Sequence, residues 1–212
     1  MAKSIKKFEP KMHKAMHKAF STAFNLNELT FMLKELEFGM DVSTNTIFFN
    51  DEVNSDSLYE TMSRFTFLLK CNGKNKHITM NVSCFGGDVY SMFGIHDCMR
   101  NFILPIDTVC IGPAMSAAAF LLTSGTGVRR VTENSTVMFH QMDSIVEGST
   151  TKIGKNVEHI KFLQKRMNEL LGKYTKKPQS FWETSMKEGD FFLNAAQCLS
   201  YGVVDEIIKM ER

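Results

Sequence analysis

Hydrophobic and polar positions follow two different periods between residues 45 and 124. Short runs of β-branched and aromatic residues predict strands, and runs with an apolar residue every three or four positions predict helices. The strands expected from this pattern are Thr46–Phe49, Ile78–Val82 and Thr108–Ile111, and the helices are Ser55–Leu69, Val89–Phe102 and Ser116–Ser124. Strands that alternate with crossover helices are typical of an α/β fold.

The pattern changes after a further strand, STVMF, which is followed directly by His140. A polar stretch then leads into one long amphipathic helix, predicted from Lys155 to Tyr174. Its apolar residues recur at helical spacing: Val157, Ile160, Leu163, Met167, Leu170 and Leu171. Such a helix either packs on a partner or covers the sheet of its own chain, and periodicity alone leaves both alternatives open.

Composition is that of a globular protein. The chain has 212 residues, 43% of them hydrophobic, which is enough for one domain with a proper core. A formal net charge of +2 does not indicate nucleic-acid binding. We expect a cytoplasmic protein, because no stretch has the roughly eighteen apolar residues of a membrane span and no secretory segment opens the chain. Five cysteines without a C-x-x-C pair are expected to be reduced thiols.

The first 24 residues differ from the rest in charge. They contain one acid, Glu9, against six lysines: Lys3, Lys6, Lys7, Lys11, Lys14 and Lys18. We expect a basic arm over residues 1–24, helical or flexible, followed by a single domain over 25–212. His13 and His17 have the spacing of metal ligands, but no acidic or cysteine partner accompanies them, so no metal site is predicted.

The segment CIGPAMSAAAFLLTSGTG carries the clearest candidate chemistry. It predicts a buried strand, a sharp turn through small residues, and a helix that begins at Ser116. A serine on such a turn is exposed as a nucleophile would be, and the first N–H groups of the helix are free to bind an oxyanion. Serines among alanines more often simply start helices, so this segment alone is weak support for catalysis.

Two further segments strengthen the hypothesis. Gly86 and Gly87 follow the strand that ends at Val82, where a glycine pair suits backbone that exposes an N–H to a ligand. His140 follows another strand. An oxyanion donor, a nucleophile and a base are therefore expected at the ends of successive strands. Cys84 is a rival nucleophile, but it lies in the strand-end run and not at the start of a helix.

At these residues the chain resembles the family of Clp protease proteolytic subunits, ClpP, peptidase family S14. The resemblance runs from about Thr46 to Ile208 and includes the Gly86-Gly87 loop, the serine segment, Val137–Gln141 and the C-terminal GDFFLNAAQCLSYGVVDEII. It implies a ClpP/crotonase-like spiral of repeated β-β-α units. A handle helix, over about 142–174 with its preceding strand, would protrude from that spiral.

The resemblance also implies the roles of individual residues. Ser116 would be the nucleophile, His140 the general base and acid, and Asp190 the carboxylate that orients the imidazole. The oxyanion donors would be the backbone N–H groups of Gly87 and Ala117. Asp143, three residues after His140, is a competing orienting acid, which we expect to face solvent.

Partners follow from the same resemblance. Residues 148–156 lack the spacing of a phosphate-binding loop, so no cofactor is expected and any ATP dependence comes from a partner. That partner would be a hexameric AAA+ unfoldase such as ClpX, ClpA or ClpC. The chain would form heptameric rings stacked in pairs, with residues 1–24 as an axial loop, and would degrade unfolded polypeptides. Gly189 stands where relatives carry an arginine used between rings, which leaves single and double rings open.

Other functions are compatible with parts of this pattern. A non-catalytic ring subunit would keep the fold alone. Phe85 and Met142, which replace family prolines, and Gly189 keep this alternative open. A crotonase-like acyl-CoA enzyme shares the fold and the paired N–H groups, but does not need Ser116, His140 and Asp190 together. A viral capsid-maturation protease of the same fold would act on a few structural proteins without an unfoldase.

Overall fold

The computed structural model describes residues 26–73 and 77–209. The chain divides between Asp41 and Val42 into two compact units. The basic arm expected over residues 1–24 lies outside the described residues. The described part of the first unit is helix α2, Leu26–Glu37, followed by strand β1, Met40–Asp41. The residues of the candidate site all lie in the second unit.

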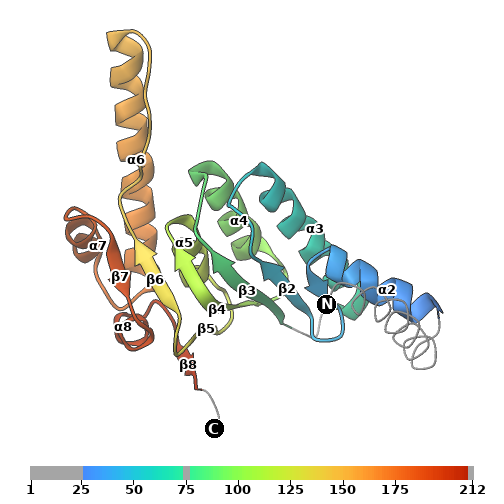
Figure 1. The fold of residues 1–212 in the computed structure, drawn as a ribbon. Helices are drawn as coiled ribbons and strands as arrows, with labels where there is room; N and C mark the ends of the chain where they lie inside the picture. Colours follow the sequence, from blue (N-terminus) through green and yellow to red (C-terminus); the bar gives the residue numbers. More distant parts are fainter. Residues whose placement is uncertain (1–25, 74–76, 210–212) are drawn as a thin grey trace, which may run out of the picture. The chain divides into compact units, whose positions relative to one another are not determined.

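The second unit is an α/β domain, as the alternating pattern predicted (Figure 1). Its strands are β2 Thr46–Phe49, β3 Ile78–Cys84, β4 Ile106–Met115, β5 Arg129–Thr132, β6 Thr136–Phe139, β7 Phe191–Leu193 and β8 Glu206–Ile208. Its helices are α3 Ser55–Asn72, α4 Val89–Asn101, α5 Ala117–Thr123, α6 Thr150–Tyr174, α7 Gln179–Ser185 and α8 Ala195–Tyr201. No described helix has both the length and the apolar composition that a bilayer crossing requires.

Strands β2, β3, β4, β5 and β8 lie side by side in that order, and each pairs with its neighbours in parallel. Parallel strands need crossover connections, and α3, α4 and α5 pack in sequence beside this sheet (Figure 1). Every residue of α5 is buried. Its three alanines, Ala117–Ala119, leave the room that this close approach needs.

Strand β4 is longer than predicted, because it continues past Ile111 to Met115 and changes partner on the way. Its first half pairs with β5 and its last residues pair with β6. Gly112 lies at the change with a φ of 79°. Its N–H donates to Ser135 Oγ at 3.1 Å, and the Ser135 hydroxyl donates to the Cys110 carbonyl at 3.0 Å. A glycine and one buried hydroxyl thus join both halves of the sheet.

Strand β6 leads from this sheet into the predicted handle. β7 pairs with β6 in antiparallel orientation, with Phe191 opposite Phe139. Beyond an extended stretch, α6 extends away from the sheet as one long helix (Figure 1). It begins earlier than predicted, because the Ser149 side chain caps its first turn by accepting the Lys152 N–H. The expected α/β class with a protruding helix is confirmed.

Arg129, the first residue of β5, is bonded to the ends of several other elements. Its guanidinium donates to both carboxylate oxygens of Asp205, at 3.0 and 2.7 Å. It also donates to the carbonyls of Thr123 and Tyr174, at 3.2 and 2.8 Å, where α5 and α6 end. These hydrogen bonds hold the pKa of the Asp205 carboxyl below its ordinary value. One side chain therefore satisfies carbonyls that the two helices leave unpaired.

A pH-dependent contribution to stability follows from this cluster. Because the folded state lowers the pKa of Asp205, its stabilisation is present above the ordinary carboxyl pKa and is lost as pH falls through the lowered value. We expect Asp205→Asn to lower the free energy of unfolding by about 1 kcal/mol at neutral pH, and the difference from wild type to shrink in acid. Urea unfolding across pH measures this, with exposed Glu188→Gln as the control. A difference independent of pH would contradict it.

Candidate active site

Ser116 lies at the junction between β4 and α5. Its φ of 54° and ψ of −124° are unusual for a residue other than glycine, and such conformations cost about 1–3 kcal/mol. Two features hold Ser116 there: its N–H donates to the Met138 carbonyl at 2.8 Å, and the following helix is wholly buried. The strain falls on the residue predicted to be the nucleophile, and a nucleophilic serine on a sharp strand-to-helix turn is typically strained in this way.

His140 follows β6, the strand to which Ser116 is bonded. Its Nε2 lies 2.7 Å from Ser116 Oγ, a hydrogen bond between the predicted base and the predicted nucleophile. The pairing of Met115 with Met138 places the ends of the two strands side by side, so the contact follows from the sheet. The His140 side chain is 22% exposed, so a ligand in contact with Ser116 also reaches the imidazole.

The glycine pair lies directly beside the nucleophile. A Cβ on Gly86, whose φ is 108°, would lie 2.7 Å from Ser116 Cβ and 3.1 Å from the Ala117 nitrogen. A Cβ on Gly87, at a φ of 147°, would collide with the carbonyl of Val53. Both positions therefore require glycine. Among the described residues, nothing accepts a hydrogen bond from the N–H of Gly87 or of Ala117, the two expected oxyanion donors.

A cleft of about 470 Å³ opens over these groups and is lined by Gly87, Ser116, Ala117 and His140. Part of its wall is apolar and comes from α4 and α6: Met92, Ile160, Leu163 and Met167. In the sequence, Ile160, Leu163 and Met167 stand out only as part of the apolar face of the long helix, and no local signal connects any of the four residues to Ser116.

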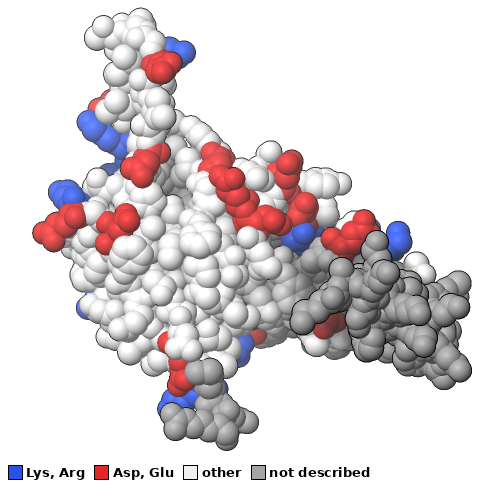
Figure 2. Space-filling model, in the orientation of Figure 1, with Lys and Arg blue, Asp and Glu red and all other residues white. Residues whose placement is uncertain are grey.

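The charged lining of this cleft is acidic. Asp88 and Asp143 contribute to it, and no Lys or Arg is found among the described residues that line it. Asp88 also caps α4, because its carboxylate accepts the N–H and the hydroxyl of Ser91. Figure 2 shows acidic side chains gathered beside the base of α6, over the ends of the connections that lead into α3 and α4.

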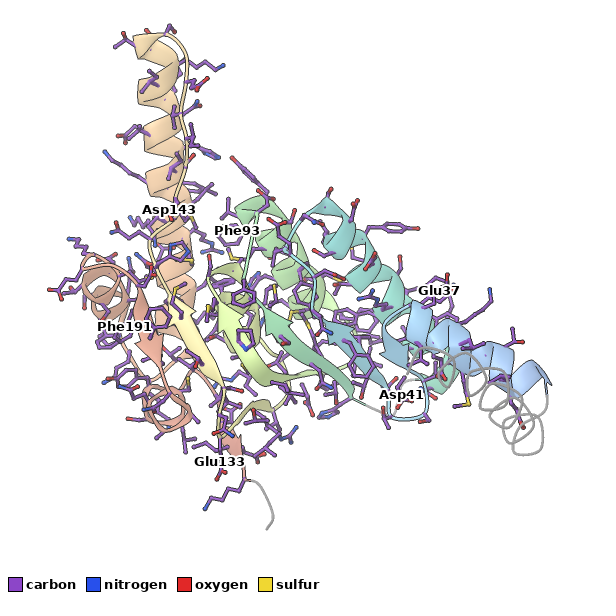
Figure 3. The ribbon with its side chains drawn as sticks, in the orientation of Figure 1. Glu37, Asp41, Phe93, Glu133, Asp143 and Phe191 are labelled. Atoms are coloured by element: carbon purple, nitrogen blue, oxygen red, sulfur yellow. The ribbon has the colours of Figure 1, made fainter. Side chains whose placement is uncertain are left out.

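The candidate carboxylates differ in their contact with His140. Asp143 Oδ2 lies 3.4 Å from His140 Nδ1, although the Asp143 side chain is 91% exposed. Figure 3 places Asp143 on the stretch that leads from β6 toward α6. Asp190 is also exposed and directly precedes β7, and no hydrogen bond or ion pair joins it to His140. Phe139 is paired with Phe191, so one further step of that ladder would set Asp190 opposite His140.

The remaining candidates do not form a second site. Cys84, the rival nucleophile, is 1% exposed, and burial raises the pKa of its thiol, which keeps the thiol protonated and unreactive. Within residues 26–73 and 77–209, no group of three or more His, Cys, Asp or Glu side chains is arranged to hold a metal ion.

Known proteins with similar sequences agree with the resemblance inferred from the motifs. The family model described as Clp protease matches residues 38–211. An ATP-dependent Clp protease proteolytic subunit of Deinococcus radiodurans is 32% identical over 146 residues, which is 68% of this chain and 71% of the relative. Proteolytic subunit 1 of Synechococcus sp. (strain CC9902) is 32% identical over 163 residues, 76% of this chain and 82% of the relative. This chain belongs to the Clp protease family.

Proposed function

We propose that this chain is a serine endopeptidase, the proteolytic subunit of a Clp-type ATP-dependent protease, with Ser116 as its nucleophile. The observation that carries the proposal is the 2.7 Å contact between His140 Nε2 and Ser116 Oγ. It occurs at a strained serine beside two backbone N–H groups without an acceptor among the described residues. Nucleophile, base and oxyanion donors thus lie in one cleft.

The reaction proceeds through an acyl-enzyme. Ser116 Oγ attacks the peptide carbonyl while His140 Nε2 takes its proton, and the N–H groups of Gly87 and Ala117 stabilise the oxyanion. The tetrahedral intermediate collapses as His140 returns the proton to the leaving amine. Water then attacks the ester, with His140 again as base, and releases the second product and free Ser116. The backbone of the Gly86-Gly87 loop offers main-chain hydrogen bonds to an extended polypeptide in the cleft.

Asp190 is the carboxylate that we assign to the imidazole. The β6–β7 ladder supports this role, because it brings the backbone of Asp190 to the strand end that carries His140. Directly opposed residues in an antiparallel pair have Cα atoms about 5 Å apart, within reach of a short side chain. Asp143 is the rival, since it lies within 3.4 Å of Nδ1. Its high exposure makes that ion pair weak.

The alternative functions fit the cleft less well. An acyl-CoA ligand carries phosphates, which proteins bind with cations or free helix N-termini. The charged side chains that line this cleft are acidic, and no Lys or Arg is found among the described residues that line it. A non-catalytic ring subunit does not need the strained Ser116 or its contact with His140. A maturation protease of the same fold would share this chemistry and differ only in its substrates.

We assign the chain to a heptameric ring, stacked in pairs, that receives unfolded polypeptides from a hexameric AAA+ unfoldase such as ClpX, ClpA or ClpC. The curated relatives are named proteolytic subunits of ATP-dependent proteases, which supports assembly with an ATPase. The handle supports packing against a second copy, because Ile145 and Phe162 are 92% and 62% exposed.

Removal of the nucleophile tests the chemistry. We expect Ser116→Ala to reduce peptide hydrolysis by about 10⁵-fold or more, because no other hydroxyl of the described residues is hydrogen-bonded to His140. Cleavage of a fluorogenic peptide and labelling by a fluorophosphonate measure the loss, and Ser200→Ala, an exposed serine of α8, is the control. Unchanged cleavage in Ser116→Ala would exclude Ser116 from the mechanism.

Two isosteric variants distinguish the roles of Asp190 and Asp143. We expect Asp190→Asn to lower kcat by about 10³–10⁴-fold through loss of imidazole orientation, and Asp143→Asn to change it by less than about tenfold. Steady-state kinetics on both variants, with circular dichroism to verify folding, makes the comparison. A large loss in Asp143→Asn with an active Asp190→Asn would transfer the role to Asp143.

The oligomeric state of the chain is tested separately from its chemistry. Native mass spectrometry of the full chain is expected to give roughly sevenfold or fourteenfold the mass of one subunit. Phe162→Glu, on the exposed face of α6, is expected to convert any fourteenfold species into the sevenfold one, since it places a charge in the contact between rings. A monomer under all conditions would contradict the ring proposal without bearing on the Ser116 chemistry.

A further inference from the structure

Cys84 is a buried thiol that the proposed mechanism does not use. It is the last residue of β3 and directly precedes the Phe85-Gly86-Gly87 loop. Its side chain is 1% exposed, and burial is the main reason that its pKa is raised. The thiol therefore stays protonated, with one hydrogen to donate and lone pairs to accept.

Both hydrogen-bonding functions of the thiol are used. Sγ lies 2.9 Å from the carbonyl of Asp51, which accepts its hydrogen, and 3.3 Å from the nitrogen of Gly86, whose N–H donates to it. Asp51 lies in the connection between β2 and α3, and Gly86 lies in the connection between β3 and α4. One side chain thus joins the glycine loop to its neighbouring connection.

The backbone completes the same attachment. Val53 N–H donates to the Gly86 carbonyl at 2.8 Å, and the Val53 carbonyl accepts the N–H of Asp88 at 2.7 Å. Of the consecutive amides of Gly86, Gly87 and Asp88, the first is bonded to Cys84 and the third to Val53. The middle amide has no acceptor among the described residues, and Gly87 lines the cleft beside Ser116.

We propose that Cys84 is a positioning residue: its thiol fixes the Phe85–Gly86 peptide, and together with the Val53 N–H on the Gly86 carbonyl it sets the next peptide so that the Gly87 N–H is directed at the oxyanion. This inference rests on the proposed function. Gly86 and Gly87, at φ values of 108° and 147°, have no Cβ to hold the backbone in place. Without the thiol, the Gly86 N–H loses its partner and the preceding peptide gains freedom to rotate. A displaced donor stabilises the oxyanion less, while binding of the ground state changes little.

Cys84→Ala and Cys84→Ser distinguish this role from simple packing. A serine hydroxyl donates and accepts as the thiol does, whereas alanine does neither. We expect Cys84→Ala to lower kcat and the rate of fluorophosphonate acylation about tenfold with little change in KM, and Cys84→Ser to retain most of both. If Cys84 only filled apolar space, Cys84→Ser would be the more impaired variant, because burial of an unpaired hydroxyl destabilises the fold more than burial of a methyl group.

The control is Cys198→Ala, which truncates an equally buried thiol on α8. Unfolding by urea corrects each rate for the folded fraction, and hydrogen exchange at the Gly86 amide is expected to be faster in Cys84→Ala than in Cys84→Ser. Equal rates and equal exchange in both variants, or a slower Cys84→Ser, would overturn the inference. If the wild-type chain itself is not labelled at Ser116, the proposed function fails, whatever the Cys84 variants do.

Discussion

The parallel pairing of the end of β4 with β6 is the constraint on which the candidate site depends. It ends in the hydrogen bond from Ser116 N–H to the Met138 carbonyl, at 2.8 Å, two residues before His140. Backbone geometry, not side-chain attraction, therefore brings the hydroxyl and the imidazole to within 2.7 Å. β4 leaves β5 at Gly112, whose φ is positive, and its last residues then pair with β6. The change of partner at this glycine therefore helps to set the position of the nucleophile.

A strained serine needs surroundings that do not relax. The conformation of Ser116 costs about 1–3 kcal/mol. A short, solvent-exposed helix after it would let the serine relax to an unstrained conformation. Here α5 is buried along its whole length, and Gly86 lies against Ser116 so closely that no side chain fits between them. The dense packing of small residues thus prevents Ser116 from relaxing and keeps the site preorganised before a substrate binds.

The sequence was most informative where structure is local. β2 has its predicted bounds, and Ser116 and His140 were both found from strand-end patterns and lie in contact. The continuation of β4 past Ile111 was not predicted, because it depends on Ser135, which lies far along the chain and bonds both sides of Gly112. The apolar cleft wall from α4 and α6 was missed for the same reason: long-range pairing has no periodic signal.

Asp143 contacts His140 in the structure, but contact alone does not identify the carboxylate that orients the imidazole. Fixing an imidazole tautomer requires an acceptor that stays in place. Asp143 is 91% exposed and Asp190 is exposed as well, so exposure does not separate the two carboxylates, and their positions relative to the cleft do. Asp143 also lines the cleft, so a bound polypeptide meets it directly, whereas Asp190 lies outside that lining. The position of Asp143 in the cleft lining therefore suits contact with the ligand and its selection. Asp190 directly precedes β7 and lies outside the cleft lining, which suits the proposed role, because a bound ligand does not displace it.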